Sequence, residues 1–363
     1  MITYQIYNDI DVSEVEEIIK NLYYKKNNIF FQSKTFINNC KNIYHNNKSK
    51  IYIIVLKENN EPILVAPLYI QKKFTIKILK WLSCETIDFN IPICDFKYLH
   101  EKSEEINTIF LKALNSLSFD ILMFDKFPEF VLENKNLFLE NFLKKYSTSC
   151  YFDGKEETQT FYINKTNSKI RQTDRRKLKK IANNEKIYYE KTDITKENFE
   201  IFEKLVKDKF TQYYNKNKKT FNTNKVKMFY FNVANDKEKN FKLIIHKMKV
   251  KNTVISIIFG IEQFNSFYYL IPYVPVSPVY KFSPGRFHIK ELLDFYKKKK
   301  MNFDFTTGDE KYKKQWSNKF YSVNYVLKIK NIKGFPIFIY FWLYYYLRKF
   351  KIIKKILQFL KVL

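Results

Sequence analysis

The sequence predicts an α/β fold with a mixed sheet, and three observations support that prediction. Apolar runs of strand length recur in both halves of the chain, as at 51–56 and 252–262. Amphipathic segments of helix length, such as 11–22 and 195–210, lie between such runs. The 363 residues are 45% hydrophobic and 18% aromatic, which is enough for real cores, and the length predicts two domains or one large one. We expect two domains.

The first domain is expected to span residues 1–155. It begins with the helix 11–22, for which either Asp11 or Ser13 supplies the N-cap. The other elements expected here are a hairpin, a helix and a strand, at 51–71, 107–117 and 121–124. This half shows no constellation of acid, base and phosphate-binding residues, so we expect it mainly to help build the fold.

The second domain is expected to span residues 156–330. Its predicted strands lie at 158–163, 187–190, 242–249, 252–262, 267–271 and 302–306. Its predicted helices lie at 167–181, at 195–210 and within 219–234, and two more begin at Ser283 and after Gly308. The order of these elements predicts a mixed sheet flanked by helices.

The predicted helix 167–181 is strongly basic. It holds three of the chain's five arginines, namely Arg171, Arg175 and Arg176. Asp174 interrupts its sparse apolar stripe between Ile170 and Leu178. A charge run of this kind is usually a solvated helix face, but it also fits a surface that meets phosphate or an acidic partner. Both interpretations stay open at this point.

The last segment, 331–363, differs in composition and is expected to form a separate tail. Residues 335–347, FPIFIYFWLYYYL, form an aromatic and aliphatic block of 13 residues, too short for a membrane span of about 20. Residues 348–363 interleave lysines with apolar residues. This pattern favours a basic amphipathic helix at a membrane surface. The alternative is a terminal helix packed on the body of the protein.

The chain carries a formal net charge of +28, with an isoelectric point near 9.6. Lysine is spread over the whole chain, and neither an RNA-binding signature nor a zinc-ligand spacing is present. We therefore expect acidic partners such as phosphates, acyl carriers or anionic lipid, no bound metal, and no nucleic acid other than tRNA.

The four cysteines, Cys40, Cys84, Cys94 and Cys150, include no CxxC pair and are too sparse for a disulfide framework. They are expected to act as small buried hydrophobic residues in a reducing cytoplasm. The first residues show no basic start followed by an apolar block, so no signal peptide is expected.

The stretch 268–316 carries most of the functional signal. A strand and a loop lead to Ser283-Pro284-Gly285-Arg286, where Ser is a favoured N-cap and Pro a favoured first helical residue. The free N–H groups of such a helix start attract anions, Gly285 permits close approach, and Arg286 adds a charge with fork geometry. The alternative is an ordinary capped helix with an unrelated arginine.

Glycine is scarce, with only 5 residues in the chain, and Gly260, Gly285 and Gly308 lie within or just before this stretch. The excess of Lys, Asn, Ile, Phe and Tyr is typical of a genome that avoids GC-rich codons. A glycine or arginine that remains against such drift is expected to have a structural or chemical role.

These residues resemble the C-terminal half of the CelD/FemAB-like group of the GNAT acyltransferase superfamily. The matching features are the aromatic strand that ends near Tyr273, the Ser-Pro-Gly helix start, the 303–305 strand, Gly308, and the Tyr312-Lys313 pair followed by Trp316. Leu64–Leu68, with Asp88 and Pro92 downstream, resembles the N-terminal half of the same group. The resemblance implies two tandem GNAT-like domains, the first degenerate, each with a mixed, mostly antiparallel twisted sheet flanked by helices.

Acyl transfer from a CoA thioester needs a pyrophosphate cradle, donors for the carbonyl oxygen, and a group that deprotonates the amine. The predicted cradle comprises Ser283, Gly285, Arg286 and Phe287, and backbone N–H groups within 269–273 would supply the donors. Asp304 is the first candidate base or orienting group, and Asp309 or Glu310 could replace it. Tyr273 or Tyr312 would protonate the leaving thiolate.

Four further residues are candidates for substrate binding: Asp88, Arg171, Arg175 and Lys313. Lys313 could instead pair with Asp309 at i,i+4 spacing. His288 and Trp316 are expected to be structural.

The resemblance implies an N-acyltransferase that uses acetyl-CoA or another acyl-CoA as co-substrate. It implies an amine acceptor such as an amino sugar or a precursor in cell-envelope or exopolysaccharide biosynthesis. Acyl carrier protein or aminoacyl-tRNA could replace acyl-CoA as the donor. Two further classes of protein stay open, namely a non-catalytic membrane-associated binding protein and an RNA-binding protein that uses 171–180. The expected location is the cytoplasm, peripheral on the inner face of the membrane.

Overall fold

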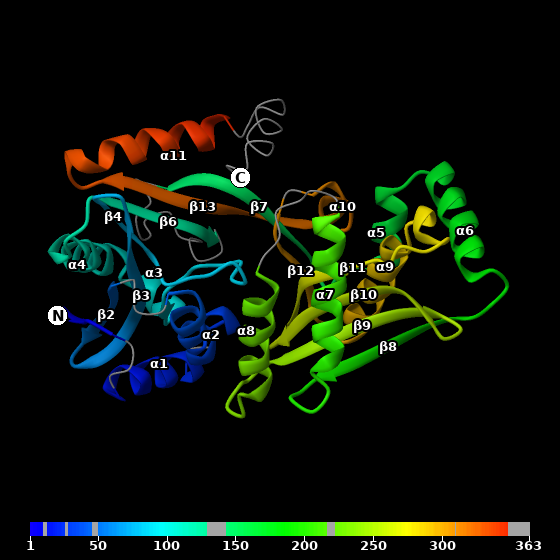
Figure 1. The fold of residues 1–363 in the computed structure, drawn as a ribbon, viewed down its shortest axis with the longest axis horizontal. Coiled ribbons are helices and arrows are strands. Elements are labelled where there is room, and N and C mark those ends of the chain that lie inside the picture. Colours follow the sequence, from blue (N-terminus) through cyan, green and yellow to red (C-terminus); the bar gives the residue numbers. More distant parts are fainter. Residues whose placement is uncertain are drawn as a thin grey trace. The chain divides into compact units, whose positions relative to one another are not determined.

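The chain folds into two units, and the polypeptide passes from the first unit into the second and then returns to the first (Figure 1). Unit 1 comprises Met1–Ser147 and Ser322–Leu363, and unit 2 comprises Thr148–Tyr321. The computed structural model describes residues 1–9, 13–25, 28–45, 50–128, 143–215, 222–308 and 310–347. The strand β7 (Leu143–Phe152) carries the chain from unit 1 into unit 2, and β13 (Lys319–Ile329) carries it back.

The sheet of unit 1 is mixed. Its strands run in the order β1 (Ile2–Tyr7), β2 (Lys50–Glu58), β3 (Glu61–Lys73), β4 (Ile76–Trp81), β6 (Ile121–Pro128) and β13, while β5 (Ile93–Cys94) pairs with β3. All these pairs are antiparallel except β4 with β6. The predicted hairpin is confirmed as β2 and β3, with Glu58 opposite Glu61 at the turn.

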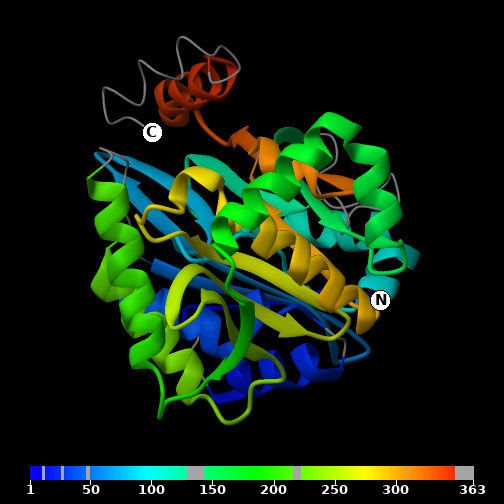
Figure 2. The same ribbon diagram turned by 90° about the vertical axis from the view of Figure 1, so that its right-hand side faces the viewer.

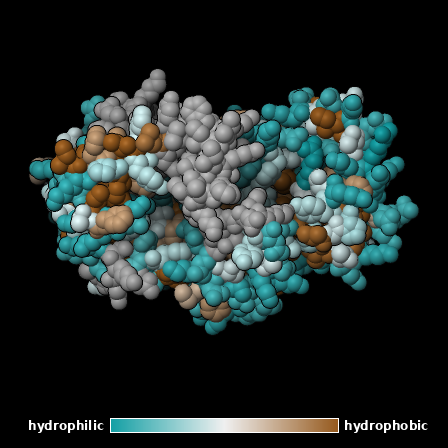
Figure 3. All heavy atoms as spheres, turned by 45° about the horizontal axis from the view of Figure 1, so that its top comes forward, coloured by the Kyte–Doolittle hydropathy of each residue, from teal (hydrophilic) through white to brown (hydrophobic). Residues whose placement is uncertain are grey.

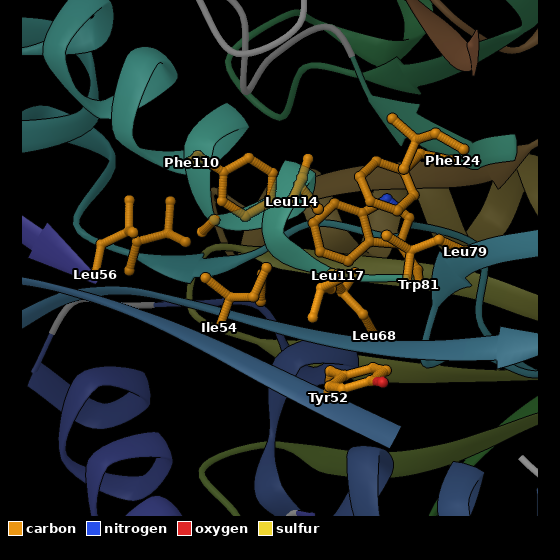
Figure 4. Packing of buried hydrophobic residues seen from close by; sticks show 14 of the residues in the cluster. Tyr52, Ile54, Leu56, Leu68, Leu79, Trp81, Phe110, Leu114, Leu117 and Phe124 are labelled. Carbon is orange, nitrogen blue, oxygen red and sulfur yellow. The ribbon is translucent and has the colours of Figure 1, made fainter. Parts of the chain in front are cut away.

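Helices cover this sheet. They are α1 (Ser13–Lys25), α2 (Lys34–Asn39), α3 (Phe96–Glu101), α4 (Ser103–Ser116) and α11 (Phe335–Leu347). Figure 4 shows Phe110 and Leu114 of α4 over the strand residues, with Trp81 and Phe124 beside them. Because the alternate residues of β2 that face α4 are apolar, this face of the sheet forms a continuous core.

The aromatic block predicted in the tail is the helix α11, which packs on the sheet of unit 1 through one side. Ile337 is buried there against Ile78, Ile121 and Met123. Its opposite side leaves large apolar residues exposed, namely Phe335, Ile339, Tyr340, Trp342 and Leu343. No helix in the described part of the chain is long and apolar enough to cross a membrane. The predicted basic helix 348–363 lies outside the described residues.

The strands of unit 2 are also mixed in direction, and they lie between two layers of helices. Its strands run in the order β7, β12 (Asn302–Thr307), β11 (Ser266–Tyr273), β10 (Thr253–Gln263), β9 (Lys242–Val250) and β8 (Ile187–Ile194). Its helices are α5 (Thr158–Lys165), α6 (Ser168–Ala182), α7 (Glu200–Tyr214), α8 (Thr223–Asn235), α9 (Pro284–Lys298) and α10 (Lys311–Gln315). All strand pairs are antiparallel except β11 with β12.

The two helix layers pack on opposite faces of this sheet (Figure 2). On one face, Tyr296 of α9 stacks on Phe267 of β11 with ring centroids 4.6 Å apart. On the other face, Phe259 of β10 packs against Phe202 of α7 and Tyr230 of α8. Ile258 belongs to the core under α9, so consecutive residues of β10 pack alternately against the two helix layers.

The prediction of a strand at 158–163 is wrong, because this segment forms the helix α5. Thr158 and Phe161 are its buried residues, and their spacing of three places both on one side of a helix. Phe161 packs edge-on against Phe152 of β7. A short run of β-branched and aromatic residues is compatible with either a strand or a helix. The contact of Phe161 with Phe152 therefore decides the conformation of this segment.

A buried histidine is fixed beneath α9. The hydroxyl of Tyr296 donates to Glu262 at 2.8 Å, so the 2.7 Å contact between Tyr296 and His246 Nε2 requires the imidazole to be the donor. Burial, followed by Lys191 and Lys299, lowers the pKa of His246 to about 3. The ring is therefore neutral at physiological pH and carries its proton on Nε2.

Candidate active site

The parallel strands β11 and β12 stop pairing partway along their length. Their register runs from Ser266 opposite Asn302 to Tyr268 opposite Asp304, although β11 continues to Tyr273 and β12 to Thr307. Thr306 has a φ of 54°, and its hydroxyl donates to the carbonyl of Tyr269 at 3.2 Å in place of a backbone bond. Such irregularities at the carboxyl ends of parallel strands are typical of ligand sites.

Asp304 lies immediately before this irregularity. Its Oδ1 accepts a hydrogen bond from the backbone N–H of Thr306 at 2.6 Å, and its Oδ2 accepts one from the Tyr321 hydroxyl at 3.0 Å. Burial and the Asp304 carboxylate both raise the pKa of Tyr321, so the phenol stays protonated and donates. Because Phe303 and Phe305 face the core under α9, Asp304 faces the side covered by α7 and α8.

The turn after β12 holds a buried lysine. Lys313 is only 5% exposed, and its ammonium donates to the carbonyl of Thr307 at 2.7 Å and lies 3.4 Å from Glu310. Gly308 has a φ of 145°, a backbone conformation that residues with a side chain rarely adopt, so glycine is favoured there. The predicted roles of Asp309, as a base and as a partner of Lys313, fall on a residue outside the described ones.

Tyrosines line the end of β11. The hydroxyls of Tyr269 and Tyr312 share a hydrogen bond, and burial raises the pKa of both. Burial, followed by Asp208 of α7, also raises the pKa of Tyr273. Gln212 of α7 donates to the carbonyl of Val274 at 3.0 Å and so fixes the point where the chain leaves the strand. Tyr273 and Tyr312 are therefore protonated at neutral pH and can donate a proton.

The helix α9 begins where the sequence predicted, but its cap differs. Pro284 is the first helical residue and Ser283 occupies the N-cap position, yet the Ser283 side chain makes no capping hydrogen bond. The 3₁₀ turn Tyr280–Phe282 brings Ser283 into the left-handed region, with a φ of 62°. A capping side chain requires an extended N-cap residue, so the expected cap is wrong while the expected start is right.

Arg286, in the first turn of α9, is bound by an aspartate of α6. Its Nη2 lies 2.9 Å from Asp174 Oδ2, its Nε donates to the same carboxylate at 3.1 Å, and its Nη1 donates to Gln315 at 2.7 Å. The guanidinium also lies 5.0 Å from the centroid of the Trp316 ring. The arginine that was predicted to hold phosphate thus has its charge compensated within the protein.

Asp174 is the residue of this site that sequence reasoning missed. It is 8% exposed, faces inward from a helix whose other faces are basic, and also accepts a 2.7 Å hydrogen bond from Tyr162. A signal for it was present, because an acid placed seven residues before Ile181, the buried apolar residue of this helix, falls on the same helix face. An acid on the inward face of a basic helix indicates a buried partner of opposite charge.

The other predicted residues have varied placements. Arg171 donates to the carbonyl of Thr166 and, at 3.3 Å, to that of Ile163, so it closes the end of α5. Arg175 is exposed. Phe287 is buried in a cluster with Ile181, Met248 and Ile255, which leaves only its backbone available to a ligand. Asp88 belongs to unit 1 and is half-buried.

Known proteins share both the sequence pattern and the fold of this chain. Residues 168–314 match the sequence model described as an acetyltransferase (GNAT) domain. The structure is similar to that of FemX, with a TM-score of 0.57 and 12% identity over 92% of this chain and 99% of that one. It is also similar to L-PGS from Bacillus licheniformis, with a TM-score of 0.51 and 9% identity over 89% and 95%. A comparison with curated proteins finds no match.

Residues 168–314, which lie within unit 2, therefore have the sequence pattern of a GNAT acetyltransferase domain, as the resemblance implied. The chain as a whole has the double-GNAT fold of the FemAB-like group, and that prediction is confirmed.

We expect Asp174→Asn to destabilise the protein by about 3 kcal/mol, because the substitution keeps the shape but leaves the guanidinium of Arg286 without its counter-charge. Urea unfolding measures the change. The matched control is Asp294→Asn, which removes a partly exposed i,i+4 pair with Lys290 and should cost less than about 0.5 kcal/mol. Equal losses in the two variants would show that the Asp174–Arg286 pair has no special role.

Proposed function

We propose that this protein is an N-acyltransferase that moves an acyl group from acetyl-CoA or another acyl-CoA onto an amine. The observation that carries the proposal is that β11 and β12 stop pairing after Tyr268 and Asp304, inside the segment that matches the GNAT domain. The chain between these strands forms α9, whose N-terminus follows the end of β11. The end of β11, the start of α9 and the carboxylate of Asp304 thus come from a single continuous segment of the chain.

The start of α9 fits the anionic part of a CoA molecule. Gly285 lies in the first turn of α9. A Cβ at this position would lie 3.0 Å from Val274 Cγ2, so the space beside the Gly285 backbone is narrow but a methyl group nearly fits it. Two lysines flank this point, because Lys180 and Lys281 lie 5.6 Å and 5.3 Å from the ring centroid of Phe282. Since Asp174 neutralises Arg286, the helix dipole, the backbone and these lysines would hold the phosphates.

The transfer forms a C–N bond and breaks a C–S bond, and it needs one proton removed and one supplied. In the proposal, backbone N–H groups within 269–273 polarise the thioester carbonyl. Asp304 orients the acceptor amine or takes its proton. Tyr273 or Tyr312 supplies a proton to the thiolate, and both phenols are kept protonated by their raised pKa values. Lys313 serves to hold the turn after β12 in place.

An amino sugar or a precursor in envelope or exopolysaccharide biosynthesis is the acceptor that we propose. A second class of donor is supported by a separate observation, namely the exposed basic side of α6. Arg175, Arg176, Lys179 and Lys180 are exposed there, whereas Asp174 faces inward. Such a surface suits a polyanionic carrier, either acyl carrier protein or aminoacyl-tRNA.

Calorimetry with acetyl-CoA tests the donor. We expect the wild-type chain to bind and Gly285→Glu to bind at least about tenfold more weakly, because a carboxylate at the helix start repels the phosphates. Gly285→Ala is the matched control and should retain binding, since the nearest atom to the added Cβ is a Val274 methyl group. If the wild type does not bind acetyl-CoA or a longer acyl-CoA, acyl-CoA is excluded as donor. The same titration with acyl carrier protein and with aminoacyl-tRNA then decides between these two carriers.

Asp304→Asn should leave acetyl-CoA affinity unchanged and lower kcat by about 10²- to 10⁴-fold, because the amide can neither take a proton nor attract the acceptor ammonium. The assay is release of free CoA in the presence of an amino sugar. Asp294→Asn, an equivalent change on the exposed side of α9, should have no effect on turnover. Wild-type kcat in Asp304→Asn would remove Asp304 from the mechanism.

We also propose that the exposed side of α11 lies on an anionic membrane surface. Trp342 and Tyr340 are each 43% exposed on this helix, and Lys73 lies 5.1 Å from the centroid of the Tyr340 ring. Figure 3 shows hydrophobic residues gathered at the upper left, where α11 lies. Phe74, at the β3–β4 turn, is 92% exposed. Aromatic residues beside lysines are typical of interfacial binding.

Sedimentation with vesicles that contain phosphatidylglycerol tests this surface. We expect the full chain to pellet with them, and Ile339→Glu with Trp342→Glu to reduce pelleting at least about tenfold. Truncation at Lys333 should also abolish it, although it removes the buried Ile337 as well. The control Tyr214→Glu changes an exposed aromatic residue in unit 2. Failure of the full chain to pellet would contradict the membrane proposal.

A further inference from the structure

Two cysteines that are 44 positions apart in the sequence meet in unit 1. The thiol of Cys40 donates to Cys84 Sγ with the sulfur atoms 3.0 Å apart. This separation is only about 1 Å longer than the ~2.05 Å of a disulfide bond. The spacing of the two residues fits no motif, so the contact could not be predicted from the sequence. The residues proposed for acyl transfer lie in unit 2, so the pair does not belong to that site.

A helical segment holds Cys40, and a loop that is hydrogen-bonded at both ends holds Cys84. Cys40 is fully buried and stands between α2 and the π-helical turn Cys40–Tyr44. Cys84 is half-buried in the loop after β4. The loop is fastened at both ends, because Leu82 N–H donates to the Pro67 carbonyl at 2.9 Å and Asn90 N–H to the Lys126 carbonyl at 2.9 Å.

The surroundings shift the pKa values of the two thiols in opposite directions. Burial alone would raise the pKa of Cys84, but hydrogen bonds from Cys40 and Thr86 and the charge of Lys126 lower it below its ordinary value. The Thr86 hydroxyl lies 2.9 Å from Cys84 Sγ, and the Lys126 ammonium reaches the same loop by donating to the Ile87 carbonyl. Burial and the neighbouring Cys84 raise the pKa of Cys40. Cys84 is therefore the more acidic of the two thiols, and Cys40 is placed to donate a hydrogen bond to it.

The remaining cysteines have the opposite character. Burial raises the pKa of Cys94, and it raises that of Cys150 to about 11. Both are buried, whereas Cys84 retains access to solvent. Since the thiolate is the reactive form, Cys84 is the cysteine best suited to react among the four, and the Cys40 sulfur lies within reach of it.

We propose that Cys84 and Cys40 form a peroxide-sensitive dithiol that closes to an intramolecular disulfide. The Cys84 thiolate attacks one oxygen of a hydroperoxide, so that an S–O bond forms and the O–O bond breaks. The alkoxide or hydroxide that leaves takes a proton from solvent and becomes an alcohol or water. Cys84 is then a sulfenic acid. Cys40 attacks its sulfur, the S–S bond forms, the S–O bond breaks, and the Cys40 proton leaves with the hydroxide as water. The peroxide is reduced by two electrons, and a cellular thiol reductant resets the pair.

The disulfide would join the turn 40–44 to the loop 82–90. Cytosolic disulfides are usually transient and serve in redox sensing, which suits a pair that is held close but not bonded. Neither sulfur lies in unit 2, which holds the residues to which we assign roles in acyl transfer. Asp88, a substrate-binding candidate in unit 1, lies in the same loop as Cys84.

The test is oxidation of the full reduced chain with one equivalent of hydrogen peroxide, followed by peptide mass spectrometry without reduction. We expect a single linked peptide pair that contains Cys40 and Cys84 and the loss of two hydrogen atoms per chain. With iodoacetamide at pH 7, Cys84 should react at least about tenfold faster than Cys94 or Cys150. Both results can be measured whether or not the protein transfers acyl groups.

Single substitutions separate the two roles. In Cys40→Ser, Cys84 should stop at the sulfenic acid and be captured by dimedone. In Cys84→Ser, Cys40 should become unreactive toward peroxide. Cys94→Ser, the matched control in the same unit, should give the same linked pair as the wild type. Oxidation spread over all four cysteines, or a sulfenic acid on Cys84 in the wild type that never links to Cys40, would overturn the proposal.

Discussion

The buried ion pair between Asp174 and Arg286 fixes the arrangement on which the candidate site depends. Four segments converge on it, because Tyr162 of α5 donates to Asp174 and Gln315 of α10 accepts from Arg286. Trp316 contacts the guanidinium and also stacks on the ring of Tyr162 at 5.8 Å. A paired and hydrogen-bonded charge of this kind holds its neighbours in one arrangement, so the start of α9 has a defined position relative to α5, α6 and α10.

This pairing limits how the site can recognise an anion. Two cations of the candidate site, Arg286 and Lys313, already have protein partners. The attraction must then come mainly from the backbone at Gly285 and from lysines such as Lys281, whose charges are spread over the surface. Backbone dipoles need no reorganisation when a ligand arrives, whereas mobile lysines add affinity that salt can screen.

Much of the fold could be predicted from the sequence, because β10, β11, β12 and α9 carry strong local patterns and firm boundaries. Local pattern failed where tertiary contact decides. The segment 158–163 became a helix because Phe161 packs on Phe152, and Ser283 lost its capping role because the preceding turn sets its φ. The contacts of Asp174 with Arg286 and of Cys40 with Cys84 join residues 112 and 44 positions apart, and one sequence alone contains no record of such pairs.

The composition of the chain nevertheless indicated structurally constrained positions, because residues of scarce types occupy them. Gly260 is one of 5 glycines, and a Cβ there would lie 2.3 Å from the carbonyl oxygen of Tyr268 on the neighbouring strand, so no other residue fits. Arg286 is among the few arginines, and its planar fork binds Asp174 through two nitrogens while it covers the Trp316 ring. Lysine, a point charge on a flexible stem, could not do both. Against a background that favours lysine, Arg286 therefore marks a place where geometry and not charge alone is required, whereas Arg175 and Arg176 are exposed.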